Sequence, residues 1–328
     1  MHTPTQPDAE PPPGRRGGVH RSREHRRRRF RRHRRRAYIR SIYFLPSLAT
    51  LGNAVCGFAA MYVAALAFAA LESGHTSLLY TDRWTQWWAQ RGFTAAAYLI
   101  FLAMVFDALD GRLARFTRHT TDFGGQLDSL ADVVSFGAAP AFIALLLFRV
   151  EVLDVRDVPV ALSRLNWAIG ALYFSCAALR LARFNVSNEH GEQHHFSFLG
   201  LPSPGAGGAV AAFILMQQDL RQLGSPLGGG YALAGTLADV CVYLLPAIVL
   251  STGLLMVANI RYPHVVNRYL RGRRSLARLL FVVVLLLLLV VYHQYTLGIG
   301  MLLYAFWGLA NWLFTRMRRI TPPAAAST

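Results

Sequence analysis

The stretch FDALDGRLARFTRHTTDFGGQLDSLADVVSFG, from Phe106 to Gly137, decides the fold of this chain. It sets four aspartates against segments apolar enough to cross a membrane: Asp107, Asp110, Asp128 and Asp132. An ionised carboxylate is costly inside a bilayer, so acidic residues in membrane segments are rare and mark functional sites. The stretch therefore predicts two membrane helices whose ends carry a polar site.

The composition of the whole chain is that of a membrane protein. Its 328 residues are 54% hydrophobic and 16% charged, with a mean hydropathy of +0.31. The apolar residues come in blocks of roughly 20, the length that spans a bilayer core as a helix. Eight blocks lie at about 44–70, 93–115, 126–148, 165–185, 205–218, 231–258, 276–292 and 296–315. We expect an all-α integral membrane protein, a bundle of about eight transmembrane helices.

Arginines are distributed unevenly over the connections between these blocks. All 34 basic residues are arginine, and their excess alternates from one connection to the next. In membrane proteins the cytoplasmic loops carry the excess of basic residues. The alternation predicts that both termini are cytoplasmic and that the four aspartates lie at cytoplasmic helix ends. We expect a protein integral to the cell (inner) membrane, with its active site facing the cytoplasm.

The composition also divides the chain into three regions. Residues 1–36 are predicted to form a disordered, Arg-rich cytoplasmic tail, because a run of arginines cannot bury a core. We expect the tail to lie on anionic membrane lipids, and without interleaved aromatic residues it predicts no specific nucleic-acid partner. Residues 37–260 form the predicted membrane domain, and 261–328 add C-terminal transmembrane helices and a short tail. The apolar flanks would allow a homodimer.

The four aspartates have helical spacing. Asp107 and Asp110 are three residues apart, and Asp128 and Asp132 are four apart. Each pair therefore shares one helix face, with Cβ atoms about 5–6 Å apart. The two helices are consecutive and joined by a short link, so they are predicted to be antiparallel neighbours. Both pairs can then point into one cavity.

Four converging carboxylates repel one another unless a cation lies between them. Oxygen-rich sites suit Mg²⁺, Mn²⁺ or Ca²⁺ and not Zn²⁺, and four acids are enough for two ions that act together in phosphoryl chemistry. A simpler interpretation pairs the acids with Arg112, Arg115 and Arg118 of the same connection. That interpretation would suit one aspartate, and it does not account for four with helical phasing.

The chain resembles the CDP-alcohol phosphatidyltransferases in their whole signature, D-x2-D-G-x2-A-R-x8-G-x3-D-x3-D, which runs here from Asp107 to Asp132. The resemblance implies a membrane enzyme that moves a phosphatidyl group from a CDP-linked lipid to an alcohol and releases CMP. It also implies that all four aspartates lie at a site for Mg²⁺ or Mn²⁺, and that Asp132 acts as general base. The small and basic residues of the signature would bind the CDP-lipid: Gly111, Ala114, Arg115 and Gly124.

Two further motifs are similar to those of bacterial and archaeal phosphatidylserine synthases, a branch of this family. The first is LPSLATLGNAVCG, residues 45–57, in which Asn53 and Thr50 would face the nucleotide. The second is RLARFN, residues 180–185, followed by FLGLPSPGAGGA, residues 198–209. The resemblance implies transfer of the phosphatidyl group of CDP-diacylglycerol to the hydroxyl of L-serine, which gives phosphatidylserine and CMP.

The RLARFN motif offers groups for the anions of such a reaction. Arg180 and Arg183 are three residues apart at a predicted helix end, so one could take the serine carboxylate and the other a phosphate. Asn185 would contact the same ligands. In the alternative interpretation the two arginines are topology anchors and Asn185 caps the helix.

Other functions compete with serine transfer. The same chemistry could use glycerol phosphate, inositol phosphate or choline as the acceptor, although the second motif argues against these. A divalent cation transporter would need its carboxylates nearer the membrane midplane and on discontinuous helices. No activated Ser–His or Cys–His pair stands out, which favours direct transfer over a covalent intermediate.

Overall fold

The computed structural model describes residues 47–72, 83–117, 122–153, 159–189, 200–260 and 276–320, all within one compact unit, Pro46–Thr328. Within these residues the chain forms helices joined by turns, and no strand. The predicted all-α class is therefore confirmed. The predicted tail, residues 1–36, lies outside the described part of the chain.

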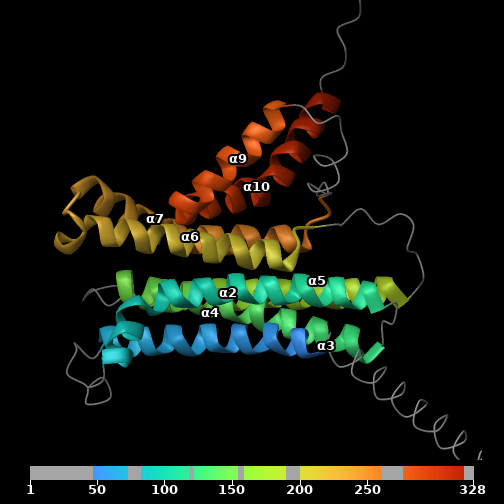
Figure 1. The fold of residues 1–328 in the computed structure, drawn as a ribbon, viewed down its shortest axis with the longest axis horizontal. Coiled ribbons are helices and arrows are strands. Elements are labelled where there is room, and N and C mark those ends of the chain that lie inside the picture. The colour runs from blue at the N-terminus through green and yellow to red at the C-terminus, as the bar shows by residue number, and fades with distance from the viewer. Residues whose placement is uncertain are drawn as a thin grey trace, which may run out of the picture. The chain divides into compact units, whose positions relative to one another are not determined.

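Long helices make up the described part of this unit; one of them contains π-helical turns, and a 3-10 turn connects two others (Figure 1). The first described helix is Ser47–Glu72. It is followed by α2 (Arg83–Thr117), α3 (Asp122–Asp132), η2 (Val133–Ala138), α4 (Ala139–Phe148), η3 (Arg149–Leu153), α5 (Val160–Glu189), α6 (Ser203–Gly224), η4 (Pro226–Gly228), α7 (Ala232–Val257), α9 (Leu276–Val291) and α10 (His293–Ile320).

Six of the described helices are long and apolar enough to cross a membrane. The predicted total of about eight crossings stays a prediction, as does the cytoplasmic position of the termini. Helix α6 does not reach the hydropathy of a membrane span because its last turns carry Gln217, Gln218 and Asp219. The prediction for this helix, 205–218, was also too short, because the helix runs from Ser203 to Gly224.

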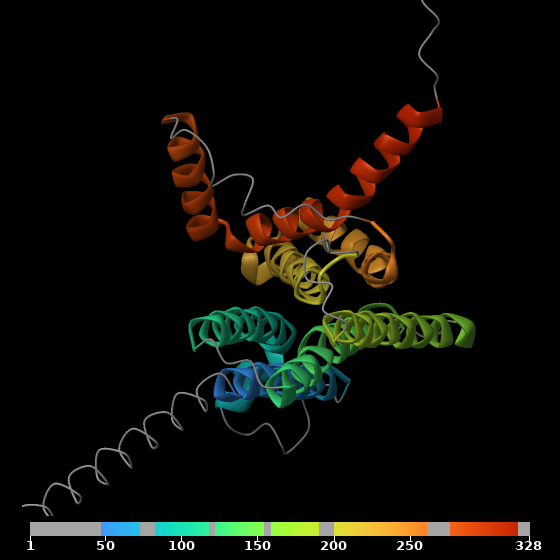
Figure 2. The same cartoon turned by 90° about the vertical axis from the view of Figure 1, so that its right-hand side faces the viewer.

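Helix α6 packs against α7, α2, η2 and α10, so protein rather than lipid surrounds much of it. Figure 2 shows α10, in red, lying across α6, in yellow. The first half of α6 is rich in small residues, which allow neighbouring backbones to approach closely. A Cβ added at Gly207 would lie 3.1 Å from Phe136 Cα, and one at Gly208 would lie 3.0 Å from Met104 Sδ. Close packing explains why a buried helix can have so few large apolar residues.

The third predicted block, 126–148, is one continuous helical rod in which α3 and α4 are joined by the π-helix η2. The wider turn of a π-helix leaves main-chain groups to be satisfied from outside, and such turns are common at functional sites. Here Tyr173 OH donates to the η2 carbonyl of Phe136 at 3.0 Å, and the η2 side chain of Ser135 donates from Oγ to Asn53 O of the first helix at 2.8 Å. These contacts fix the helix immediately after Asp132.

The start of α6 is tied to the end of α7. Gly200 has a φ of +87°, a conformation that favours glycine. Its N–H donates to Ile260 O at 2.8 Å, and the N–H of Leu201 donates to Leu255 O at 2.9 Å. Pro204 lies in the first turn of α6, where its missing N–H costs nothing. The connection therefore holds Ser203 in a fixed, fully buried position.

Candidate active site

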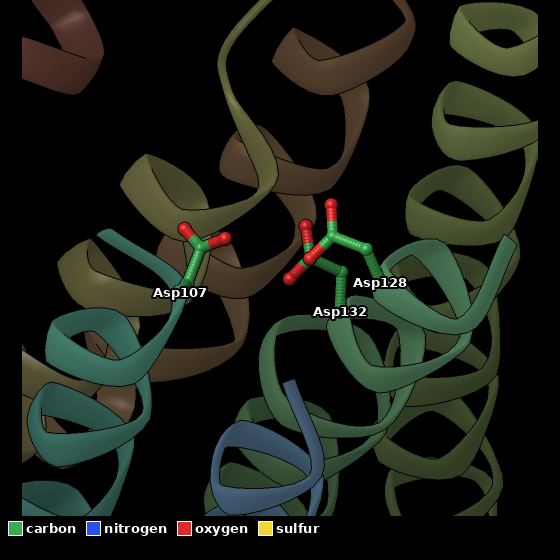
Figure 3. Close-up of side chains that lie close together, drawn as sticks. All are labelled: Asp107, Asp128 and Asp132. Atoms are coloured by element: carbon green, nitrogen blue, oxygen red, sulfur yellow. The ribbon is translucent and has the colours of Figure 1, made fainter. Parts of the chain in front are cut away.

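Three of the four signature aspartates form one cluster. Asp107 on α2 and Asp128 and Asp132 on α3 each offer a carboxylate oxygen, and these oxygens all lie within 4.8 Å of one another (Figure 3). Asp132 is buried, whereas Asp107 and Asp128 are half-buried. The two consecutive helices thus bring carboxylates together, as their spacing predicts.

Asp110 takes a different position from its three partners. Its side chain is buried, and its carboxylate accepts a hydrogen bond from the hydroxyl of Thr50 on helix Ser47–Glu72. It does not belong to the group of oxygens that lie within 4.8 Å of one another. The first helix therefore holds the Asp110 carboxylate through the hydroxyl of Thr50.

Asn53 orients the deepest carboxylate of the cluster. It is fully buried, and its Nδ2 donates to Asp132 Oδ1 at 3.1 Å. The main-chain oxygen of the same residue accepts the hydrogen bond from Ser135. Asn53 Oδ1 is buried and has no hydrogen-bond partner among the described residues. One asparagine thus fixes both Asp132 and the π-helix that follows it.

The cluster has the features of a cation site. The ion pairs among the described side chains join Arg149 to Glu72 and Arg221 to Glu151 and Asp239, and none reaches a signature aspartate. Asp128 Oδ1 is buried without a hydrogen-bond partner there. Hard divalent cations prefer such carboxylate oxygens as ligands. The residues present therefore fit a divalent cation, and Mg²⁺ or Mn²⁺ as the particular ion stays a prediction.

The two arginines of RLARFN point to different places. Arg180 Nη1 donates to Ser203 Oγ at 2.8 Å, and its guanidinium interacts electrostatically with Asp132. Arg183 is exposed and donates from Nη1 to Asn259 Oδ1 at 3.1 Å, at the end of α7. Arg180 thus contacts the start of α6, and Arg183 contacts the residue that follows the end of α7 closely.

Asn185 links α5 to α3. Its Oδ1 accepts a hydrogen bond from Ser129 Oγ at 3.0 Å, and Ser129 Oγ also lies 3.1 Å from the Gly125 carbonyl. Ser129 stands next to Asp128, so this bond braces the helix turn that carries a cluster carboxylate. Sequence reasoning did not single out Ser129, Ser135 or Ser203 as functional, although Ser203 lies within the LPSP stretch that it quoted.

The predicted lipid-binding positions are partly described. A Cβ added at Gly111 or at Gly125 would meet no atom of the described residues within 4 Å, so none of these residues fills the space next to either glycine. Gly124 is half-buried in the first turn of α3. The side chains of Ala114 and Arg115 lie outside the described part of the structure.

Comparison with known proteins agrees with this geometry. Residues 43–239 match the family model of the CDP-alcohol phosphatidyltransferases. The match includes all four aspartates and the helices that carry Thr50, Asn53 and Arg180. The chain therefore belongs to the CDP-alcohol phosphatidyltransferase family, a class of transferases in phospholipid biosynthesis.

Individual relatives are similar to this chain over much of its length. The CDP-diacylglycerol–serine O-phosphatidyltransferase of Helicobacter pylori is 32% identical over 228 residues, which cover 70% of this chain and 84% of the relative. The protein of the same name from Methanocaldococcus jannaschii is 34% identical over 171 residues, 52% of this chain and 64% of its own. The archaetidylserine synthase of Methanothermobacter thermautotrophicus is 30% identical over 196 residues, 59% of this chain and 66% of its own.

Proposed function

We propose that this protein transfers the phosphatidyl group of CDP-diacylglycerol to the hydroxyl of L-serine, giving phosphatidylserine and CMP. The observation that carries the proposal is the cluster of Asp107, Asp128 and Asp132 with Arg180 beside it. The cluster supplies ligands for a divalent metal, and the guanidinium supplies a partner for an acceptor carboxylate. The names of the similar proteins support serine as the acceptor.

The four aspartates would hold the metal. When bound there, the divalent ion would supply positive charge to polarise phosphoryl oxygens and to offset negative charge on the CMP leaving group. Asp107 and Asp110 come from α2, and Asp128 and Asp132 come from α3. Thr50 orients the Asp110 carboxylate, and the Ser129–Asn185 bond braces the turn that carries Asp128.

Asp132 is the proposed general base. Asn53 fixes its Oδ1, so the orientation of the second carboxylate oxygen is also set. That carboxylate accepts the hydroxyl proton of serine as the serine oxygen attacks the phosphorus that bears the lipid. The new serine O–P bond forms as the bond from this phosphorus to the CMP oxygen breaks. Direct attack needs no nucleophile from the protein.

The CDP-lipid is proposed to enter beside the glycines of the signature. The open space at Gly111 and Gly125 would admit the cytidine diphosphate group, near Thr50 and Asn53. Ala114, Arg115 and Gly124 are proposed to complete this pocket. The arginine pattern supports a site at the cytoplasmic face of the inner membrane, with the acyl chains in the adjoining leaflet.

An acceptor comparison tests the proposal. Purified protein in detergent receives CDP-diacylglycerol, Mg²⁺ or Mn²⁺, and serine, glycerol phosphate, inositol phosphate, choline or no acceptor. We expect CMP release only with serine and metal. Asp132→Asn should abolish it, whereas Asp239→Asn, an exposed aspartate paired with Arg221 near the opposite end of α6, should not. Release with another acceptor alone would refute serine specificity, and no release from folded protein would refute the transferase proposal.

A further inference from the structure

The helical rod that carries Asp128 and Asp132 changes its hydrogen-bond pattern directly after the second aspartate. At the end of η2, the N–H of Ala139 donates to Val134 O, five residues back, where an α-helix would use the carbonyl four residues back. A π-helical turn therefore holds one residue more than an α-helical turn. Because successive residues lie about 100° apart around a helix axis, this extra residue sets how α3 is rotated relative to α4.

Pro140, next to the end of η2, accounts for part of this change. In an α-helix the N–H of residue 140 would donate to Phe136 O, but proline has no N–H, and its ring collides with that carbonyl in a regular helix. Tyr173 of α5 supplies a donor instead. Its hydroxyl donates to Phe136 O at 3.0 Å, and both side chains are fully buried. The tyrosine hydroxyl thus takes the place of the N–H that Pro140 lacks.

Neighbouring helices enclose this contact. A Cβ added at Gly253 of α7 would lie 3.2 Å from both Tyr173 Cα and Tyr173 Cδ2, and one at Gly207 of α6 would lie 3.1 Å from Phe136 Cα. Backbones approach this closely where the residue is glycine. Helix α4 is buried over most of its length, whereas α3 is largely exposed before Ala131. A change of register at η2 would therefore turn α3 and leave α4 in place.

We propose that Tyr173 is a positioning residue whose hydroxyl keeps η2 in the π-helical register. In that register Asp128 and Asp132 face Asp107, and their carboxylate oxygens lie within 4.8 Å of one another (Figure 3). An α-helical register would remove the extra residue and rotate α3 by about 100°, which would turn both carboxylates away from Asp107. The inference rests on the proposed function, because it takes the aspartate cluster as the metal site.

Binding of Mn²⁺ to the purified full-length protein tests this role without turnover. Tyr173→Phe keeps the ring and removes the hydroxyl that donates to Phe136 O. A titration followed by the electron paramagnetic resonance signal of free Mn²⁺ should give a dissociation constant about tenfold above that of wild type, as for the loss of a supporting contact at a metal site. The melting temperature in detergent should also fall, because a buried carbonyl loses its partner.

Asn166→Ala is the matched control, because it removes the same kind of bond between α5 and the same helical rod. Asn166 Nδ2 donates to Leu145 O of α4 at 3.2 Å, further along the rod from Asp132. We expect a lower melting temperature and an unchanged Mn²⁺ dissociation constant. An equal loss of Mn²⁺ affinity in Asn166→Ala would overturn the proposal. So would a Tyr173→Phe variant that melts at a lower temperature but binds Mn²⁺ as tightly as wild type.

Pro140→Ala separates helix register from stability. Alanine restores an N–H at this position, so Phe136 O can be paired within an α-helix and no longer depends on Tyr173. In the Pro140→Ala background, Tyr173→Phe should lower the melting temperature less than it does alone. The double variant should still bind Mn²⁺ about tenfold more weakly than wild type. Wild-type Mn²⁺ affinity in the double variant would overturn the proposal, and this measurement decides the matter where Tyr173→Phe alone does not fold.

The two proposals fail in different ways. Wild-type protein that binds no Mn²⁺ would refute the proposed metal site and the role of Tyr173 with it. Wild-type protein that binds Mn²⁺, together with a Tyr173→Phe variant of equal affinity, would refute only the role of Tyr173. Transfer to an acceptor other than serine would refute the proposed acceptor, and a weaker Mn²⁺ affinity in Tyr173→Phe would still support the role of the tyrosine.

Discussion

Asn53 donates a hydrogen bond from Nδ2 to Asp132 Oδ1 at 3.1 Å, with both side chains buried. This bond joins the first described helix to the carboxylate proposed as the general base. Because the Asn53 main chain also holds Ser135, the position of Asp132 depends on two contacts from one residue.

Replacing Asn53 by alanine should reduce kcat more than it changes either KM. Loss of the bond leaves Asp132 free to rotate, and a lost hydrogen bond to a charged group is worth about 1.5–3 kcal/mol, or roughly 10–100-fold in rate. Initial-rate kinetics would show this change. Ser175→Ala, which removes an exposed hydroxyl bonded only to its own helix, serves as the control. An unaltered kcat in Asn53→Ala would show that Asp132 needs no such orientation.

Thr50 should set metal affinity through Asp110. Thr50→Val removes the hydroxyl that donates to the Asp110 carboxylate, and loss of such a supporting contact lowers metal affinity about 10–100-fold. The Mn²⁺ concentration for half-maximal activity should rise accordingly, and Thr50→Ser should restore it. Equal Mn²⁺ dependence in wild type and Thr50→Val would place Asp110 outside the metal site.

The packing between the first helix and the π-helix should tolerate no additional atom at Gly57. A Cβ there would lie 2.6 Å from Ser135 Cα, and overpacking of this kind costs about 1–3 kcal/mol. Gly57→Ala should therefore lower both the melting temperature in detergent and the activity. Gly300→Ala, whose new Cβ would meet no atom of the described residues within 4 Å, should leave both unchanged. Normal melting and activity in Gly57→Ala would contradict the described contact.

Gly111 offers the opposite test, because a Cβ added there would meet no atom of the described residues within 4 Å. Gly111→Leu should leave the melting temperature unchanged and raise KM for CDP-diacylglycerol, since the new side chain would fill space proposed for the cytidine diphosphate. Competition by CDP in the same assay would report the same loss of nucleotide affinity. If the variant bound CDP as tightly as wild type, the proposed pocket would lie elsewhere.

The sequence predicts much of this arrangement because membrane helices have strong local signals. The length of the apolar blocks predicts the helices. The helical spacing of the aspartates predicts that the carboxylates of Asp107, Asp128 and Asp132 lie close together. Spacing could not show that Asp110 turns to Thr50, because that contact joins residues far apart in the chain. Nor could it separate Arg180 from Arg183, since the difference depends on Ser203 and on the end of α7.

The full length of helix α6 and the presence of the π-helix escaped prediction for physical reasons. The apolar block of α6 ends at Gln217, Gln218 and Asp219, but the helix continues through this polar stretch to Gly224. The π-helix η2 depends on hydrogen bonds from Ser135 to Asn53 and from Tyr173 to Phe136, which are tertiary contacts. Neither feature has a signal confined to its own segment.

Product stoichiometry is the most direct test of serine transfer. Wild-type protein would receive CDP-diacylglycerol and isotopically labelled serine, and both CMP and labelled lipid would be measured in the same reaction. We predict one phosphatidylserine for each CMP, no product after chelation of divalent cations, and recovery when Mn²⁺ is added back. CMP released without labelled lipid would show hydrolysis in place of transfer, and would contradict the proposed function.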